Sequence, residues 1–176
     1  MPVLPFYQFE LKDKLNSKPQ CFDSFNFLFL LQGTGTIRCR NQLIHLKPHD
    51  FTFFNMYEIH QFLTFSPDAR VLSVLIHKSY IQSAVPELTD MTLNTHTVTP
   101  ESEPERYEFF CQEFGKFIYY HTVHSPGAQL HALSHLGNLL SYILNQLSTS
   151  SASALHGTQT RDDRLFHALT YITEHY

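Results

Sequence analysis

Five polar residues stand in or beside the most apolar stretches of this 176-residue chain, and their types suit recognition of a small molecule. An arginine can pair with a carboxylate or with two hydroxyl groups, and amide, phenol and imidazole groups can hydrogen-bond to a hydroxyl. Because alternate side chains of a strand point to opposite faces, each of them faces either a pocket or solvent. The five candidates are Asn26, Arg38, Asn55, Tyr57 and His60.

Catalytic chemistry has less support in the sequence. The chain contains no Gly-x-Ser-x-Gly, no His-Glu-x-x-His and no glycine-rich phosphate loop. Cys39 lies near Arg38 and His45, but a buried strand cysteine is far commoner than a nucleophile. The glutamates between Glu101 and Glu108 suit a solvated first turn of a helix. We therefore expect a binding protein and no catalytic residues.

The region that carries these polar residues predicts a small antiparallel barrel or sandwich. Gly33 and Gly35 accept the positive φ of a tight turn, and Pro48 begins another turn. A small barrel can hold one ligand, although Phe27, Phe29, Phe53 and Phe62 either wall a cavity or fill it. Strands are predicted at residues 6–11, 25–31, 36–39, 43–46, 51–55, 61–65, 70–77 and 95–98, with a short helix at 80–85.

The apolar periodicity becomes helical after residue 98. Thr99 and Pro100 have the residue types of a helix N-cap and first position, which predicts a helix from there to about residue 124. A second helix is expected over residues 128–147. It carries a heptad seam that predicts a dimer interface, with burial inside one chain as the alternative. The seam residues are Leu133, Leu136, Leu140, Ile143 and Leu147.

The composition limits the function classes. A net charge of −4 lacks the basic excess of a nucleic-acid surface. Three cysteines without a paired spacing favour reduced thiols, and no apolar run approaches membrane-spanning length. Twelve histidines give the chain charge sensitivity at mildly acidic pH, with compositional bias as the alternative. We expect a cytoplasmic protein with no membrane contact.

Several motifs carry a family resemblance. The Gly-x-Gly after an apolar strand, then Leu46-x-Pro48-x-Asp50-Phe51 and a histidine ten residues after the aspartate, resemble the cupin sensor domain of AraC-type transcription regulators. Those regulators usually have glycine in place of His49. Residues 148–160 have a linker composition, and residues 162–176 resemble the start of the first helix of the family's DNA-binding domain.

The resemblance implies an α+β fold, a cupin-like antiparallel β-barrel followed by two antiparallel helices. It implies an effector-binding barrel over residues 1–98, a helical dimerisation segment over 99–147, a linker over 148–160 and an incomplete helix-turn-helix domain over 161–176. The expected partners are a small effector, usually a sugar, a second copy of the chain, and DNA only through the C-terminal domain. The family's N-terminal arm often covers the pocket, which makes Tyr7 a further candidate ligand-binding residue.

The resemblance also bears on metal binding. Metal-binding cupins carry His-x-His and a glutamate at the places that hold Gln20, Phe22 and Asn26 here, so only His60 matches a ligand position. A metal requires three or four converging N, O or S ligands, and we therefore expect no metal and no cofactor. The alternatives are a metal-dependent cupin enzyme, an isomerase or dioxygenase, and a dimerisation module whose barrel binds nothing.

Overall fold

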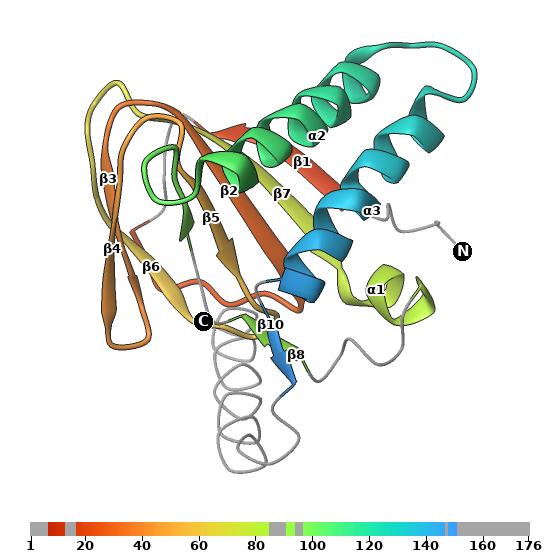
Figure 1. The fold of residues 1–176 in the computed structure, drawn as a ribbon. Helices are drawn as coiled ribbons and strands as arrows, with labels where there is room; N and C mark the ends of the chain where they lie inside the picture. Colours follow the sequence, from red (N-terminus) through yellow and green to blue (C-terminus); the bar gives the residue numbers. More distant parts are fainter. Residues whose placement is uncertain (1–6, 13–16, 85–90, 94–96, 147, 151–176) are drawn as a thin grey trace, which may run out of the picture.

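A computed structural model describes residues 7–12, 17–84, 91–93, 97–146 and 148–150. Its fold is α+β and cupin-like: two antiparallel sheets pack face to face, and two helices cover the outer face of the larger sheet (Figure 1). The predicted fold class is confirmed. Among the described residues, the strands are hydrogen-bonded as a larger and a smaller sheet, and an isolated antiparallel bridge joins Gln20 to His60 of the smaller sheet.

The strands match the predicted ones closely. The larger sheet has the order β1 (Tyr7–Lys12), β7 (Arg70–His77), β2 (Ser24–Gln32), β5 (Phe51–Phe54) and β9 (Thr97–Val98). The smaller sheet has the order β4 (Gln42–Leu46), β3 (Gly35–Cys39) and β6 (His60–Phe65). Helix α1 (Lys78–Ala84) follows β7, as expected. The sequence did not predict a two-stranded ribbon between β8 (Met91–Leu93) and β10 (Ser148–Ser150), whose second strand begins the predicted linker.

Strand β2 separates two apolar clusters because its side chains alternate between the faces of the sheet. Phe25 and Phe27 belong to the cluster under the helices, whereas Leu28 and Leu30 belong to the cluster between the two sheets. Both faces of β2 are therefore covered, one by the helices and the other by the smaller sheet. Residues 95 and 96, the first half of the last predicted strand, lie outside the described residues.

Helices α2 (Pro104–Thr122) and α3 (Ala128–Gln146) form the outer layer. Aromatic rings join α2 to the sheet: Phe114 lies 5.0 Å from Phe27, and Phe110 lies 5.3 Å from Phe53, measured between ring centroids. Such aromatic pairs add stability beyond the area they bury. Residues 107–121 therefore show helical periodicity because one side of α2 covers the sheet.

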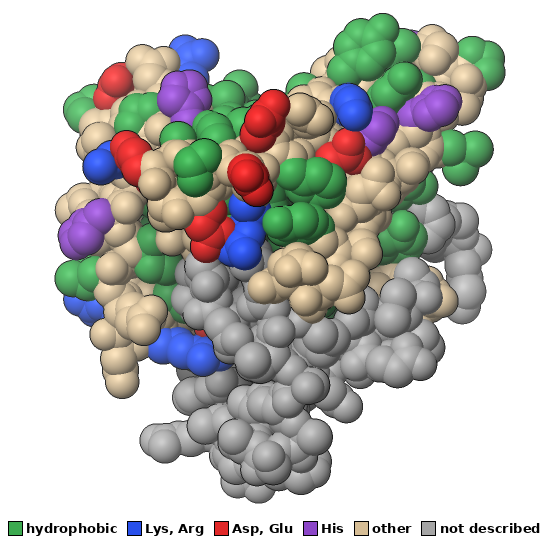
Figure 2. All heavy atoms as spheres, viewed as in Figure 1, with side chains coloured by type: hydrophobic (Ala, Val, Ile, Leu, Met, Phe, Trp, Pro, Cys, Tyr) green, Lys and Arg blue, Asp and Glu red, His purple; other side chains and the backbone are tan. Residues whose placement is uncertain are grey.

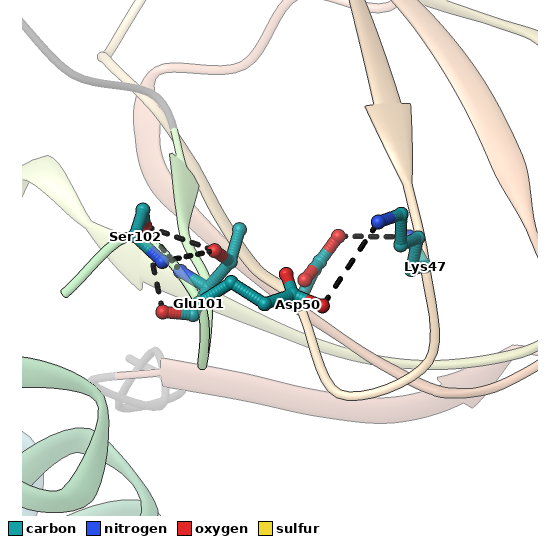
Figure 3. Close-up of polar contacts among 5 residues, drawn as sticks. Lys47, Asp50, Glu101 and Ser102 are labelled. Carbon is teal, nitrogen blue, oxygen red and sulfur yellow. Dashed lines mark hydrogen bonds and ion pairs between the residues drawn. The ribbon is translucent and has the colours of Figure 1, made fainter. Parts of the chain in front are cut away.

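The predicted start of the first helix was wrong by four residues. The N-cap is Glu103 with Pro104 in the first turn, not Thr99 with Pro100. Thr99 instead forms a separate turn, in which its Oγ1 accepts a hydrogen bond of 3.0 Å from the backbone N–H of Ser102 (Figure 3). Pro100 and Pro104 each suit the first turn of a helix. Hydrogen bonds of the Thr99 and Ser102 hydroxyls hold a separate turn after the first proline, and the helix starts at the second.

Three of the five seam residues are buried inside the chain. Leu136, Leu140 and Ile143 belong to the cluster between the helices and the larger sheet. Leu133 is half-buried, and Leu147 lies outside the described residues. This is the arrangement that the sequence left open as the alternative to an intermolecular seam.

The turn that carries the family motif explains the departure at His49. His49 has φ +75°, a left-handed conformation that glycine adopts without strain, which accounts for glycine at this place in the resembling regulators. Buried Asp50 holds the turn by accepting a hydrogen bond of 2.8 Å from the backbone N–H of Lys47 (Figure 3). Burial raises the pKa of Asp50, and the bond from Lys47 opposes that rise.

We expect His49→Gly to raise the free energy of unfolding by about 0.5 kcal/mol. Relief of left-handed strain is partly offset by the larger chain entropy of glycine in the unfolded state. Urea unfolding measures the difference. His45→Gly, in the extended strand β4, is the matched control and should destabilise. A loss of stability in His49→Gly would show that the turn is not strained.

Candidate ligand site

The space between the two sheets has an apolar part and a polar part. Its apolar part is the cluster around Leu28, Ile37 and Phe62. Its polar part lies toward the end of the larger sheet where β2 begins and β7 ends. The polar residues there are Ser24, Asn26, Thr52, His60, Ser73 and His77.

Strand register places the polar residues of the larger sheet on its inner face. Leu28 lies opposite both Thr52 and Ser73, and Asn26 is two residues from Leu28 on the same strand. Diagonal neighbours on one face of a sheet lie within reach of one another. Asn26 is therefore a diagonal neighbour of Thr52 on one side and of Ser73 on the other, and Leu28 lies between the two hydroxyl residues.

These three side chains are buried and incompletely hydrogen-bonded. Asn26 is 2% exposed, Thr52 0% and Ser73 1%. Within the described part of the chain, Asn26 Oδ1, Thr52 Oγ1 and Ser73 Oγ have no protein partner. An unpaired buried polar group costs about 1–3 kcal/mol, so such groups call for a water or a ligand. This cluster is the candidate ligand site.

His60 fixes the orientation of Asn26. His60 Nδ1 lies 3.1 Å from the backbone carbonyl oxygen of Glu58, which can only accept, so Nδ1 carries the proton. In the neutral ring Nε2 then accepts, at 3.5 Å, from the amide nitrogen of Asn26. The ring also stacks on Phe54, with centroids 4.1 Å apart and planes 6° apart. As a result, the oxygen of Asn26 is the amide atom left free.

A second histidine ends the polar row. The hydroxyl of Ser24 donates to Asp23 at 3.2 Å and lies 3.3 Å from His77 Nδ1. With the hydroxyl proton donated to the carboxylate, His77 Nδ1 can donate to Ser24, and the other ring nitrogen is Nε2. That Nε2 is buried and has no protein partner within the described residues.

The turn after β5 carries Asn55 and Tyr57, whose polar groups hold the turn and α1. Asn55 donates to Glu58 Oε2 from its backbone nitrogen at 2.9 Å and from its amide at 3.0 Å. Tyr57 has φ +61°, and its hydroxyl accepts from Lys78 Nζ at 3.1 Å. Buried Glu58 also pairs with Arg40 across 2.8 Å. These contacts hold the turn that precedes His60, the first residue of β6.

Two predicted residues lie away from the polar cluster. Arg38 is exposed between buried Ile37 and Cys39, so it points out of the sandwich, the alternative that the sequence left open. Tyr7 lies on the opposite face of the larger sheet, where its hydroxyl is 2.9 Å from His121 Nδ1 and its ring contacts Phe117. The structure thus brings together Asn26 and His60, with Asn55 and Tyr57 in the adjoining turn.

Sequence reasoning missed Ser24, Thr52, Ser73 and His77. Thr52 and Ser73 carried a usable signal, because each is a single polar residue inside an apolar strand, Phe-Thr-Phe-Phe and Val-Leu-Ser-Val. A hydroxyl that replaces an aliphatic group at a buried position costs stability unless a partner is present. Isolated polar residues in such strands are therefore candidates for an interior site.

The positions matched to cupin metal ligands do surround His60. Gln20 exchanges backbone hydrogen bonds with it, Phe22 lies 5.9 Å from its ring centroid, and Asn26 contacts Nε2. The residue types do not fit a metal, since Nε2 already accepts from an amide and a phenyl ring offers no ligand atom. Among the described residues, no group of three His, Cys, Asp or Glu side chains is placed to hold a metal ion.

His60 should make stability fall in mild acid. Burial lowers its pKa to about 4, against the hydrogen bond to Glu58 that raises it. The unfolded chain binds a proton near pH 6.5 and the folded chain does not, so stability is lost as pH falls below 6.5 until His60 itself titrates. We expect a loss of about 2 kcal/mol between pH 7 and pH 5 from this residue.

Urea unfolding at both pH values tests this expectation. The difference between wild type and His60→Gln isolates the contribution of His60, because the other histidines titrate in both proteins. An equal pH dependence in the two proteins would contradict a buried neutral His60.

Comparison with known proteins shows a shared fold. The AraC-like transcriptional activator CuxR superimposes with a TM-score of 0.53 and 8% identity, covering 75% of this chain and 46% of that chain. An apo ToxT variant from Vibrio cholerae gives a TM-score of 0.51 and 9% identity, covering 81% of this chain and 57% of that chain. The chain thus spans about half the length of either protein. No protein-family model matches it, and the comparison with curated proteins found no match.

At these identities the likeness shows the fold alone. A putative mannose-6-phosphate isomerase from Ralstonia eutropha also matches, with 10% identity over 40% of this chain and 72% of that chain, but its TM-score of 0.35 carries no argument. Structural neighbours therefore include AraC-like regulators. In the part of the chain that the structure describes, no helix is long and apolar enough to cross a membrane.

Proposed function

We propose that this chain is the effector-binding region of an AraC-type transcription regulator, and that its effector is a small carbohydrate. The observation that supports the proposal most is the set of buried polar atoms between the sheets that have no protein partner among the described residues, because small-molecule sites combine apolar walls with a few fixed polar groups. The fold shared with CuxR and ToxT adds support.

In this proposal the effector acts by binding one conformation more tightly than another. A ligand shifts an equilibrium only by its difference in affinity for the two states. The larger sheet links the site to the helices, since Asn26 and Phe27 are adjacent on β2 and Phe27 packs on α2. Effector binding would shift the helical pair and, through the chain that follows it, a C-terminal DNA-binding domain of a cytoplasmic regulator.

The proposal includes a homodimer formed through the helical pair. The inner side of α3 is buried, so its outer side and the end of the pair remain for a partner. Tyr119 is 60% exposed and Leu130 is 72% exposed. Hydrophobic and histidine side chains gather at this end of the molecule (Figure 2).

The competing hypothesis is a metal-dependent cupin enzyme, and one experiment separates the two. Thermal unfolding is followed with a panel of mono- and disaccharides, and with divalent metal ions in the presence and absence of a chelator. A sugar at one hundred times its dissociation constant should stabilise the chain by about 2.7 kcal/mol. A sugar-dependent shift that survives chelation supports the sensor. A shift with metal alone would overturn it in favour of the enzyme.

A further inference from the structure

We infer that the free edge of strand β4 pairs antiparallel with the same strand of a second copy of this chain, so that the two smaller sheets join into one continuous sheet. This contact goes beyond the proposed function, because it uses neither the ligand site nor the helical pair. Figure 1 shows β3 and β4 at the side of the molecule opposite α3. The two surfaces therefore do not compete.

The two packed sheets have four edge strands, and β4 is the one that the described residues leave unprotected. Edge strands of soluble proteins are usually short, charged or covered, because their free backbone groups otherwise pair with another chain. Strand β1 carries Glu10 and Lys12, and β9 has only two residues. Strand β6 is covered at its start by Gln20, which exchanges backbone hydrogen bonds of 2.8 and 3.0 Å with His60.

Strand β4 has none of these protections. Its sequence, Gln-Leu-Ile-His-Leu, contains no Asp, Glu, Lys, Arg or proline, and its five residue pairs with β3 run without a bulge. Leu43 is 54% exposed, and Gln42 and His45 are exposed beside it. An exposed apolar residue on a regular, uncharged edge is the combination that favours the addition of a strand.

The free backbone groups of β4 belong to Leu43 and His45. The turn that joins β3 to β4 has two residues, and such a turn closes on a hydrogen-bonded pair, here Cys39 with Gln42. Because hydrogen-bonded pairs alternate along an antiparallel ladder, Ile44 is the next residue that bonds to β3. The N–H and C=O groups of the residues on either side of it face away from β3, where the described structure has no further strand of this sheet.

A two-fold axis at Ile44 satisfies these groups with the same strand of a second copy. Leu43 then exchanges both backbone hydrogen bonds with the partner's His45, and the symmetry repeats the exchange on the other side of the axis. Ile44 lies opposite its own copy in the closely spaced kind of pair. Its side chain, 8% exposed, belongs to the apolar cluster between the sheets, so the clusters of the two copies meet there.

The same register keeps like charges apart. Arg40 precedes β4 and Lys47 follows it. The register places Arg40 opposite the partner's Pro48, and Lys47 opposite the partner's Asn41. Like charges directly opposite each other would destabilise the pair, and this register brings none together. Lys47 also lies 3.9 Å from a carboxylate oxygen of Glu101 in its own chain. The edge is therefore complementary to itself in hydrogen bonding, apolar contact and charge.

Hydrogen exchange of single backbone amides, followed by NMR, tests the pairing. Strands of five residues make a small contact, so we expect a dissociation constant of about 100 µM. Between concentrations about tenfold below and tenfold above this value, exchange of the Leu43 and His45 amides should slow about fourfold. The amides of Gln42 and Ile44 should be protected at both concentrations, because they bond to β3. The average molecular mass should rise over the same range.

Leu43→Lys separates this contact from a dimer through the helical pair. The substitution places a charge on the edge at an exposed position, so the fold should remain stable while the slowed exchange and the rise in mass are lost. Leu11→Lys is the matched control, because Leu11 is 52% exposed on the edge strand β1. This variant should associate as wild type does.

Three results would overturn the inference. The first is free exchange of the Leu43 and His45 amides at high concentration. The second is protection of these amides that does not change with concentration, which would mean that the same chain covers the edge. The third is a rise in mass that Leu43→Lys leaves unchanged, which would place the contact on another surface. None of these results involves a ligand, so the proposed function stands or falls separately.

Discussion

Leu136→Ala should lower the free energy of unfolding by about 3 kcal/mol and leave the molecular mass in solution unchanged. Leu136 is 1% exposed in the cluster between α3 and the larger sheet. Truncating it removes buried methyl groups and leaves a cavity, and both effects destabilise a close-packed core. If it lay in an intermolecular seam, the same change would alter the dimer first.

Ser134→Ala is the control, since it is also a truncation to alanine on the same helix, at an exposed residue that was not assigned to the proposed dimer surface. Its stability should stay within about 0.5 kcal/mol of wild type. Urea unfolding and light scattering at several protein concentrations measure the two quantities. If Leu136→Ala changed the molecular mass but left the stability normal, Leu136 would lie in a subunit interface and not in the core of one chain.

The heptad spacing of α3 illustrates what periodicity leaves undecided. Leu136, Leu140 and Ile143 have the spacing of a continuous apolar stripe along one side of the helix, and the structure confirms that this stripe is buried. Whether a stripe faces the same chain or another depends on what packs against it, here the larger sheet and α2. The sequence of one helix contains no information on its neighbour.

Strands were predicted well because their patterns are local. Residues 70–77 are aliphatic and β-branched, and β7 has the predicted bounds. The short ribbon of β8 with β10 was missed, since it pairs segments that are far apart in the chain and have no apolar alternation. Contacts of this kind arise from tertiary arrangement and not from local preference.

The candidate site was predicted only in part, because it too depends on tertiary arrangement. Asn26 and His60 were named because they are polar groups on or next to predicted strands, and the structure places them in contact. Arg38 was named on its chemistry alone, and its strand turns it outward. Inward or outward orientation depends on register with neighbouring strands, which one polar residue in a strand does not reveal.

Glu113→Ala should lower the free energy of unfolding by about 3 kcal/mol, because it removes the acceptor of a buried polar cluster between α2 and α3. Glu113 is 7% exposed. Its Oε2 accepts from His135 at 2.9 Å and from Asn138 at 2.8 Å, and its Oε1 accepts from Lys116 at 3.1 Å. The variant leaves these donors without their shared partner.

The pH dependence distinguishes the loss of this carboxylate from loss of packing. Burial raises the pKa of Glu113, but the bonds from His135, Asn138 and Lys116 outweigh burial and lower it from 4.5 to about 2. Its stabilisation is therefore complete above pH 4.5 and is lost as pH falls toward 2. The difference between wild type and Glu113→Ala should stay large at pH 5 and shrink below pH 4. Glu108→Ala, at an exposed position of the same helix, should show no such difference. A pH-independent difference for Glu113→Ala would mean that the charge does not join the two helices.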